Sequence, residues 1–157
     1  NNITHARESL TKIEKISGAS CISSISAIFD ILEIKKPQTV ALACTYYPDD
    51  WKDLWTSFVR ASGYEVIASQ SLVDQGIRKK ILDENDYPNS DEICESIKII
   101  SKNYPNIDAI IISGSGARTM AITDKLKKIS NKLIIAADTA LFSIIAKKLN
   151  INLPIKL

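Results

Sequence analysis

Continuous apolar segments that alternate with amphipathic helical patterns are the feature that most constrains how this chain folds. Four such segments are rich in β-branched residues and have the length of strands: Gln38–Cys44, Tyr64–Ser69, Ile107–Ser113 and Lys132–Ala137. A strand with one solvated face alternates apolar and polar residues, whereas a continuous apolar run is typical of a strand covered on both faces. The pattern therefore predicts a sheet that lies between two layers of helices.

Helical periodicity fills the intervals between these segments. In Asp49–Ser62, Trp51, Leu54, Trp55, Phe58 and Val59 fall on one helix face, and the two acids at its start suit a helix N-terminus. The order strand, helix, strand with short connections predicts right-handed βαβ units and an α/β fold with a mainly parallel sheet and helices on both faces. The least regular stretch, 70–89, is expected to be a loop with room for one short helix. The expected helices are Ala6–Ser17, Ser24–Ile34, Asp49–Ser62, Ser90–Asn103, Ala117–Ser130 and Thr139–Leu149.

Composition excludes several classes of protein and site. The 157 residues correspond to one domain, and the net charge of +2 gives no general case for nucleic-acid binding. No apolar run approaches the roughly 18 residues of a membrane span. Three separated cysteines and a single histidine, His5, argue against a zinc site and a serine–histidine–aspartate triad, and fit a reducing, cytoplasmic setting. Homo-oligomerisation is left open.

The charge is unevenly distributed along the chain. Residues 118–157 carry 8 Lys/Arg and 2 Asp/Glu, a balance of +6, so the other 117 residues carry 12 against 16, a balance of −4. Because the lysines have the spacing of a helix surface, the simplest interpretation is a solvated face.

Two predicted strand ends carry residues suited to binding a ligand, because ligands of open parallel sheets bind at the carboxyl ends of strands. Ser113, Gly114, Ser115, Gly116 and, further on, Thr119 lead into a predicted helix, and this turn could cradle a carboxylate or phosphate with backbone N–H groups and hydroxyls. The alternative is a tight strand–helix turn that needs small residues. The turn matches neither a dinucleotide-binding glycine motif nor a P-loop.

The first predicted strand is followed closely by Tyr46 and Tyr47, whose phenols could reach a carboxylate, although tyrosines at such junctions also commonly serve packing. The last strand is followed by Asp138 and Thr139, which are interpreted first as a helix N-cap pair.

Four segments together resemble a known family. VALACTYYPDDWKDLWTSFV, IDAIIISGSGARTMAITDKL, KLIIAADTALFSIIAKKLNI and ASCISSISAIFDIL are similar, in order and spacing, to the maleate isomerase and arylmalonate decarboxylase branch of the aspartate/glutamate racemase superfamily. The resemblance implies racemase-like α/β half-domains with a cleft between them, and catalysis that uses neither a metal nor an organic cofactor.

The resemblance also implies roles for particular residues. Tyr47, or Tyr46 if the alignment shifts by one, would bind a substrate carboxylate. Ser113, Gly114 and Ser115 would form the second catalytic loop, where Gly114 stands at the position of the family's second cysteine and has no thiol. Gln75 would replace a substrate-contacting asparagine. The family's first catalytic loop would precede Asn1, so residues 1–157 are expected to form a single partial domain that is inactive alone.

The resemblance implies a cofactor-independent isomerase, racemase or decarboxylase that acts on a small dicarboxylate. The alternative is a non-catalytic small-carboxylate binding or regulatory protein on the same scaffold, which the missing thiol at Gly114 favours. A flavodoxin-like nucleotide binder fits less well, because the chain lacks the fingerprint glycines and their partner acid.

Overall fold

The four strands form one parallel sheet in the order β2–β1–β3–β4. The computed structural model describes residues 2–80, 87–114 and 116–153. This topology confirms the predicted parallel α/β fold, with each strand within two residues of its expected ends. The strands are β1 (Thr39–Ala43), β2 (Glu65–Gln70), β3 (Ala109–Ile112) and β4 (Leu133–Ala136).

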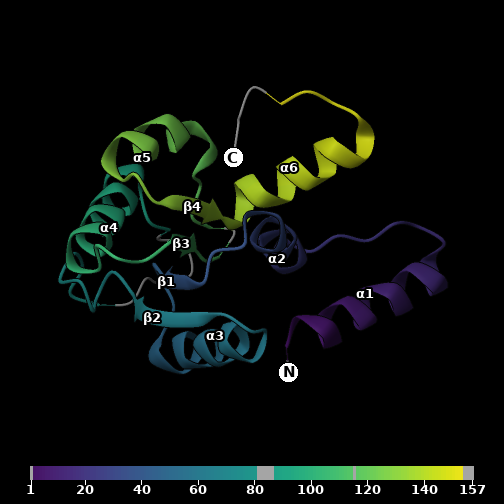
Figure 1. Cartoon of the computed structure of the whole chain (residues 1–157), viewed down its shortest axis with the longest axis horizontal. Coiled ribbons are helices and arrows are strands. Elements are labelled where there is room, and N and C mark those ends of the chain that lie inside the picture. Colours follow the sequence, from purple (N-terminus) through teal and green to yellow (C-terminus); the bar gives the residue numbers. More distant parts are fainter. Residues whose placement is uncertain (1, 81–86, 115, 154–157) are drawn as a thin grey trace.

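Helices cover both faces of the sheet, as Figure 1 shows with α4 and α5 on one side and α2 and α6 on the other. Along β3, Ile111 packs toward α2 and α6, whereas Ile110 and Ile112 pack toward α4 and α5. Because successive side chains of a strand point to opposite faces, a continuous apolar run supplies both cores at once. The helices are α1 (Ile3–Ser17), α2 (Ser24–Lys35), α3 (Asp49–Ala61), α4 (Ser90–Asn103), η1 (Met120–Ile122), α5 (Thr123–Ile129) and α6 (Ala137–Leu149).

Local sequence signals set the start of α4. Asn89 accepts hydrogen bonds from the backbone N–H groups of Asp91 and Glu92, while the Glu92 carboxylate accepts from the Asn89 N–H. This reciprocal arrangement is a capping box, which satisfies N–H groups that have no partner inside the helix. It explains why the predicted start of this helix matches the structure.

The apolar stripe of α3 is only partly buried, which differs from the expectation of one inward face. Trp55 and Val59 are buried, whereas Trp51 and Leu54 are 60% and 69% exposed. The helix lies beside β2, the strand at the edge of the sheet, so the sheet is not wide enough to cover the whole stripe (Figure 1).

The helix predicted over Ala117–Ser130 begins later than expected and in two parts. Residues 117–119 form a turn, and the short η1 precedes the seven-residue α5. In the stretch 70–89, residues 71–80 form turns and bends, and no helix occurs in the part of it that the structure describes.

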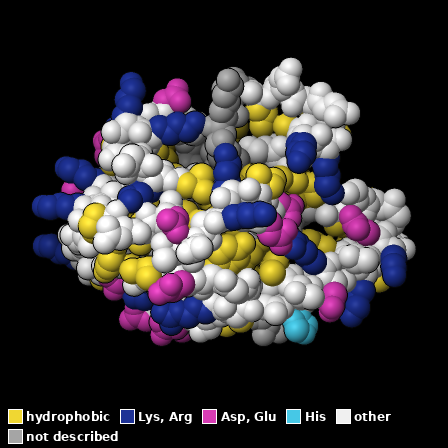
Figure 2. All heavy atoms as spheres, in the orientation of Figure 1, with side chains coloured by type: hydrophobic (Ala, Val, Ile, Leu, Met, Phe, Trp, Pro, Cys, Tyr) yellow, Lys and Arg dark blue, Asp and Glu magenta, His cyan; other side chains and the backbone are white. Residues whose placement is uncertain are grey.

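The basic bias of the C-terminal segment is spread over helix surfaces. Lys125 pairs with Asp91 of α4, and Lys148 donates a hydrogen bond to Ser20. In Figure 2, Lys and Arg side chains are interspersed with Asp and Glu over the visible face. Within the described ranges, no helix combines the length and apolar character that a membrane crossing requires.

Candidate functional site

A pocket of about 250 Å³ opens where β1 and β3 end. These strands are neighbours, with Ala43 paired to Ile112, so the residues that follow them meet at one edge of the sheet. The structure therefore brings both predicted tyrosines together with the start of the predicted loop. The lining residues are Ser24, Ile25, Ile28, Tyr46, Tyr47, Trp51, Trp55, Ser113, Gly114 and Ala137.

The Tyr46 hydroxyl lies directly against the turn after β3. Its oxygen accepts a hydrogen bond from the Gly116 N–H at 3.3 Å. A Cβ atom built on Gly114 would lie 2.2 Å from the same oxygen, and Gly114 has a φ of +87°. Burial raises the pKa of Tyr46, and the Gly116 N–H partly offsets that shift. Position 114 thus needs glycine for its backbone conformation and for the space that the phenol fills.

Tyr47 lies beside Tyr46 and packs edge-on against it, with ring centroids 5.4 Å apart. A turn closed by a hydrogen bond from the Tyr47 N–H to the Cys44 carbonyl directs both rings toward the pocket. Thr45 within this turn has a φ of 23°, a conformation that non-glycine residues rarely adopt. Burial, followed by the neighbouring Tyr46 and Cys44, raises the pKa of Tyr47 to about 12, so its phenol is neutral at physiological pH.

Two buried polar groups of the pocket lining have no hydrogen-bond partner. Ser113 is 1% exposed and its hydroxyl is unpaired among the described residues, as is the indole N–H of Trp55. The Ser113 hydroxyl makes no well-formed hydrogen bond to a described residue. It does lie close enough to the Cys44 thiol to oppose the rise in the pKa of that thiol. Because buried polar groups are normally satisfied, these donors indicate a place for a bound acceptor.

The rest of the predicted anion cradle is committed to internal contacts. Asp138 accepts hydrogen bonds from the Thr119 N–H at 2.6 Å, the Thr119 hydroxyl at 2.5 Å and the Met120 N–H at 3.2 Å. The Gly116 N–H is used by Tyr46, and Ser115 lies outside the described residues. The expectation of free donors at a helix start directly after Gly116 was therefore wrong.

The same contacts correct the interpretation of Asp138 and Thr139 as an N-cap pair. The N-cap of α6 is Ala136, so Asp138 lies inside the first turn and its carboxylate faces the preceding loop. The Asp138 carboxylate also accepts a hydrogen bond from the N–H of the next residue, Thr139, at 2.8 Å.

Gln75 does not join the pocket. Its side-chain amide donates to the Ser96 carbonyl of α4 at 3.2 Å. Helix α4 packs on one face of the sheet, whereas Tyr47 packs with α2 on the opposite face. The structure therefore separates Gln75 from the other predicted site residues.

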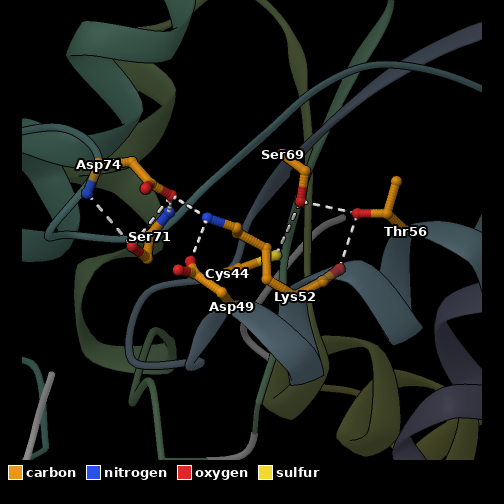
Figure 3. Close-up of polar contacts among 7 residues, drawn as sticks. All are labelled: Cys44, Asp49, Lys52, Thr56, Ser69, Ser71 and Asp74. Atoms are coloured by element: carbon orange, nitrogen blue, oxygen red, sulfur yellow. Dashed lines mark hydrogen bonds and ion pairs between the residues drawn. The ribbon is translucent and has the colours of Figure 1, made fainter.

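A polar network lies next to the pocket, on the β2 side of β1 (Figure 3). Lys52 forms ion pairs with Asp49 at 2.8 Å and Asp74 at 2.7 Å, and its side chain is 13% exposed. The Cys44 sulfur lies 3.4 Å from the Ser69 hydroxyl. No local pattern predicts the Lys52–Asp74 pair, because 22 residues separate its members. Lys52 is neutralised by two carboxylates and does not line the pocket.

Burial makes the Cys44 thiol unreactive, because it raises the pKa of that thiol to about 11. Cys44 is 0% exposed and Cys94 is 6% exposed, whereas Cys21 is partly accessible. We expect a thiol reagent at about pH 8 to modify Cys21 rapidly and the other two cysteines only after denaturation. Counting modified thiols by mass spectrometry tests this, with Cys21→Ser as the control that removes the fast reaction. Rapid modification of Cys21→Ser would contradict the buried placement.

The pocket lining consists of neutral hydrogen-bond donors and apolar surface. Phenols, a hydroxyl and an indole N–H can bind an anion, while none of the described lining residues carries a carboxylate, an imidazole or an ammonium group. Among the residues that the structure describes, no group of three or more His, Cys, Asp or Glu side chains could hold a metal ion.

Comparisons with known proteins agree with this architecture. The sequence model of the family described as arylmalonate decarboxylase matches residues 3–153. None of the curated protein sequences matches this chain significantly. Among solved structures, an unliganded arylmalonate decarboxylase is similar with a TM-score of 0.73 and 16% identity, over 88% of this chain and 57% of that one.

Two further structures have the same fold. The maleate isomerase from Pseudomonas putida aligns with a TM-score of 0.70 and 16% identity, covering 92% of this chain and 58% of its own. An aspartate racemase homologue from Pyrococcus horikoshii aligns with a TM-score of 0.55 and 15% identity, covering 82% and 56%. The present chain thus spans a little over half the length of these relatives.

Proposed function

The chain belongs to the arylmalonate decarboxylase family, and from that membership we propose that it acts on a small dicarboxylate as a cofactor-independent isomerase, racemase or decarboxylase. The structural relatives carry the names of a decarboxylase, an isomerase and a racemase homologue. They share this fold, and their reactions have in common a carboxylic acid substrate. The substrate and reaction of this chain are the proposal.

The observation that carries the proposal is the uncommitted Ser113 hydroxyl in a pocket that two tyrosines also line. A carboxylate accepts hydrogen bonds from several donors at once, and such charge-assisted bonds are stronger than neutral ones. Ser113 and Tyr47 approach from neighbouring strand ends, so one carboxylate can bind between them. A second carboxylate or a reacting carbon would then lie toward Tyr46.

Non-catalytic carboxylate binding is the second candidate, and Gly114 favours it. With no thiol at this position and with Cys44 buried directly after β1, the described pocket offers no thiol nucleophile. Such a protein would bind the same ligands without turning them over.

Calorimetric titration with maleate, aspartate, glutamate, a hydantoin and phenylmalonate, followed by turnover assays, tests the proposal. We expect Ser113→Ala to weaken binding of the preferred acid about 10-fold, since a hydrogen bond to a charged group contributes about 1.5 kcal/mol or more. Ser96→Ala is the matched control, because Ser96 is equally buried with an unpaired hydroxyl but lies on α4 outside the pocket.

Each result separates the candidates. Binding with turnover supports the enzyme, and binding without turnover supports the non-catalytic protein. If no acid binds, or if both serine variants weaken binding equally, the pocket is not a carboxylate site.

A further inference from the structure

We infer that Tyr46 is the proton donor of this pocket, with its hydroxyl occupying the space that a side chain at position 114 would fill. The inference rests on the proposed function and names the group that performs its chemical step. It concerns an acid that the resemblance to the family does not supply, since there the tyrosine of this segment is expected to bind a carboxylate.

The first argument is the position of the hydroxyl. A Cβ atom at Gly114 would lie 2.2 Å from the Tyr46 oxygen and 2.6 Å from the ring carbon that bears it. The phenol and a side chain at 114 therefore exclude each other. A phenol O–H is therefore present beside the turn after β3, and it comes from the turn after β1.

The second argument distinguishes Tyr46 from Tyr47. The Tyr46 oxygen accepts the Gly116 N–H, and that bond persists and strengthens when the phenol becomes a phenolate. Because the Tyr46 oxygen already accepts a backbone N–H, its own hydrogen is free to be donated to a ligand. No N–H or O–H group among the described residues donates to the Tyr47 oxygen, so its phenolate would be unsupported.

The third argument is that the phenol is held in place from both sides. The Tyr46 ring packs edge-on against Tyr47 at 5.4 Å and against Tyr87 at 5.9 Å. The Tyr87 ring itself covers Gly116, where an added Cβ would lie 2.3 Å from a ring carbon. A proton donor must be fixed within hydrogen-bond reach of the atom it protonates, and this packing fixes Tyr46.

A pocket with an acid and no base favours one type of reaction. Loss of CO₂ from a malonate-type acid leaves the electron pair of the broken carbon–carbon bond on the α-carbon as an enediolate. The Tyr46 O–H then gives its proton to that carbon, forming the C–H bond of the product, and the phenolate takes a proton back from water. Racemisation would also require a base to remove an α-proton, and none lines the described pocket.

This assignment predicts turnover by residues 1–157 themselves, in contrast to the expectation from the resemblance that they are inactive alone. The test uses phenylmalonate as the probe, with binding measured by calorimetry and decarboxylation by product formation at saturating substrate. We expect Tyr46→Phe to lower kcat about 100-fold or more, the range for a general acid, while the affinity changes less than about threefold. Tyr47→Phe should weaken binding. Tyr104→Phe, a tyrosine at the end of α4 outside the pocket, is the control and should change neither.

The pH dependence provides a readout that a purely structural role would not alter. Because the donor must be protonated, kcat of the parent protein should fall at alkaline pH, above the ordinary phenol range of about 10. This decline should persist in Tyr47→Phe and disappear in Tyr46→Phe. A parent-like kcat in Tyr46→Phe, or an unchanged alkaline decline, would overturn the assignment. Binding without turnover by the parent protein would also overturn it but leave carboxylate binding intact, whereas absence of binding would refute the proposed function itself.

Discussion

Alanine at position 114 is expected to destabilise the protein by about 2–5 kcal/mol and to displace the Tyr46 ring. A left-handed backbone conformation costs a non-glycine residue about 1–2 kcal/mol, and Gly114 has a φ of +87°. Overpacking adds about 1–3 kcal/mol, because the new Cβ would meet three atoms of the Tyr46 side chain within 3 Å. Urea unfolding of the variant and the parent protein measures the difference in the free energy of unfolding.

Gly63 offers a matched control that separates these two costs. Its φ is +97°, but a Cβ atom there would meet nothing within 4 Å. Gly63→Ala should therefore show only the backbone cost, and Tyr46→Ala should recover part of the loss in Gly114→Ala through a non-additive double-mutant cycle. Equal losses in the Gly114 and Gly63 variants would contradict the close approach of Tyr46 to the turn.

Asp138→Ala is expected to cost about 3 kcal/mol and to lower the melting temperature by about 6–12 °C. Its carboxylate accepts bonds from the Thr119 N–H and hydroxyl, the Met120 N–H and the Thr139 N–H. Hydrogen bonds to a charged group contribute about 1.5–3 kcal/mol, and Thr119, which is 1% exposed, would be left with unpaired donors. Thermal unfolding followed by circular dichroism measures the shift.

Two substitutions bracket this prediction. Asp138→Asn keeps one carbonyl oxygen and should lose less than the alanine variant. Asp53→Ala removes an exposed acid on α3 and should change the free energy of unfolding by less than about 0.5 kcal/mol. If Asp138→Ala behaves like Asp53→Ala, the loop between β3 and α5 is held by other contacts.

Asp138 and Tyr46 also govern the geometry of the proposed site. Asp138 anchors the loop at Thr119 and Met120, and Tyr46 anchors it at Gly116. Gly116 is thus tied to the turn after β1, and Thr119 and Met120 are tied to α6. These ties keep Ser113 in the lining of the same pocket as the tyrosines.

The sequence alone predicted the layered parallel sheet and the edge at which the pocket lies. Both follow from periodicity, since continuous apolar strands need cover on both faces, and the carboxyl ends of neighbouring parallel strands lie at one edge. The start of α4 was also predictable, because its capping box is local, from Asn89 to Glu92. The resemblance to the family, carried by four segments in order, is confirmed by the match over residues 3–153.

Tertiary contacts decided which groups of the predicted site remain free. The hydroxyl of Thr119 and two backbone N–H groups that the sequence offered to a ligand bind Asp138, which lies 18 or 19 residues further along the chain. The Gly116 N–H binds Tyr46 across a separation of 70 residues. A local pattern indicates which donors a segment contains, but the partner of each donor depends on where distant side chains lie after packing. For that reason the sequence determined the fold and the location of the pocket, and only the folded structure determined that Ser113 and Tyr46 are the groups available in it.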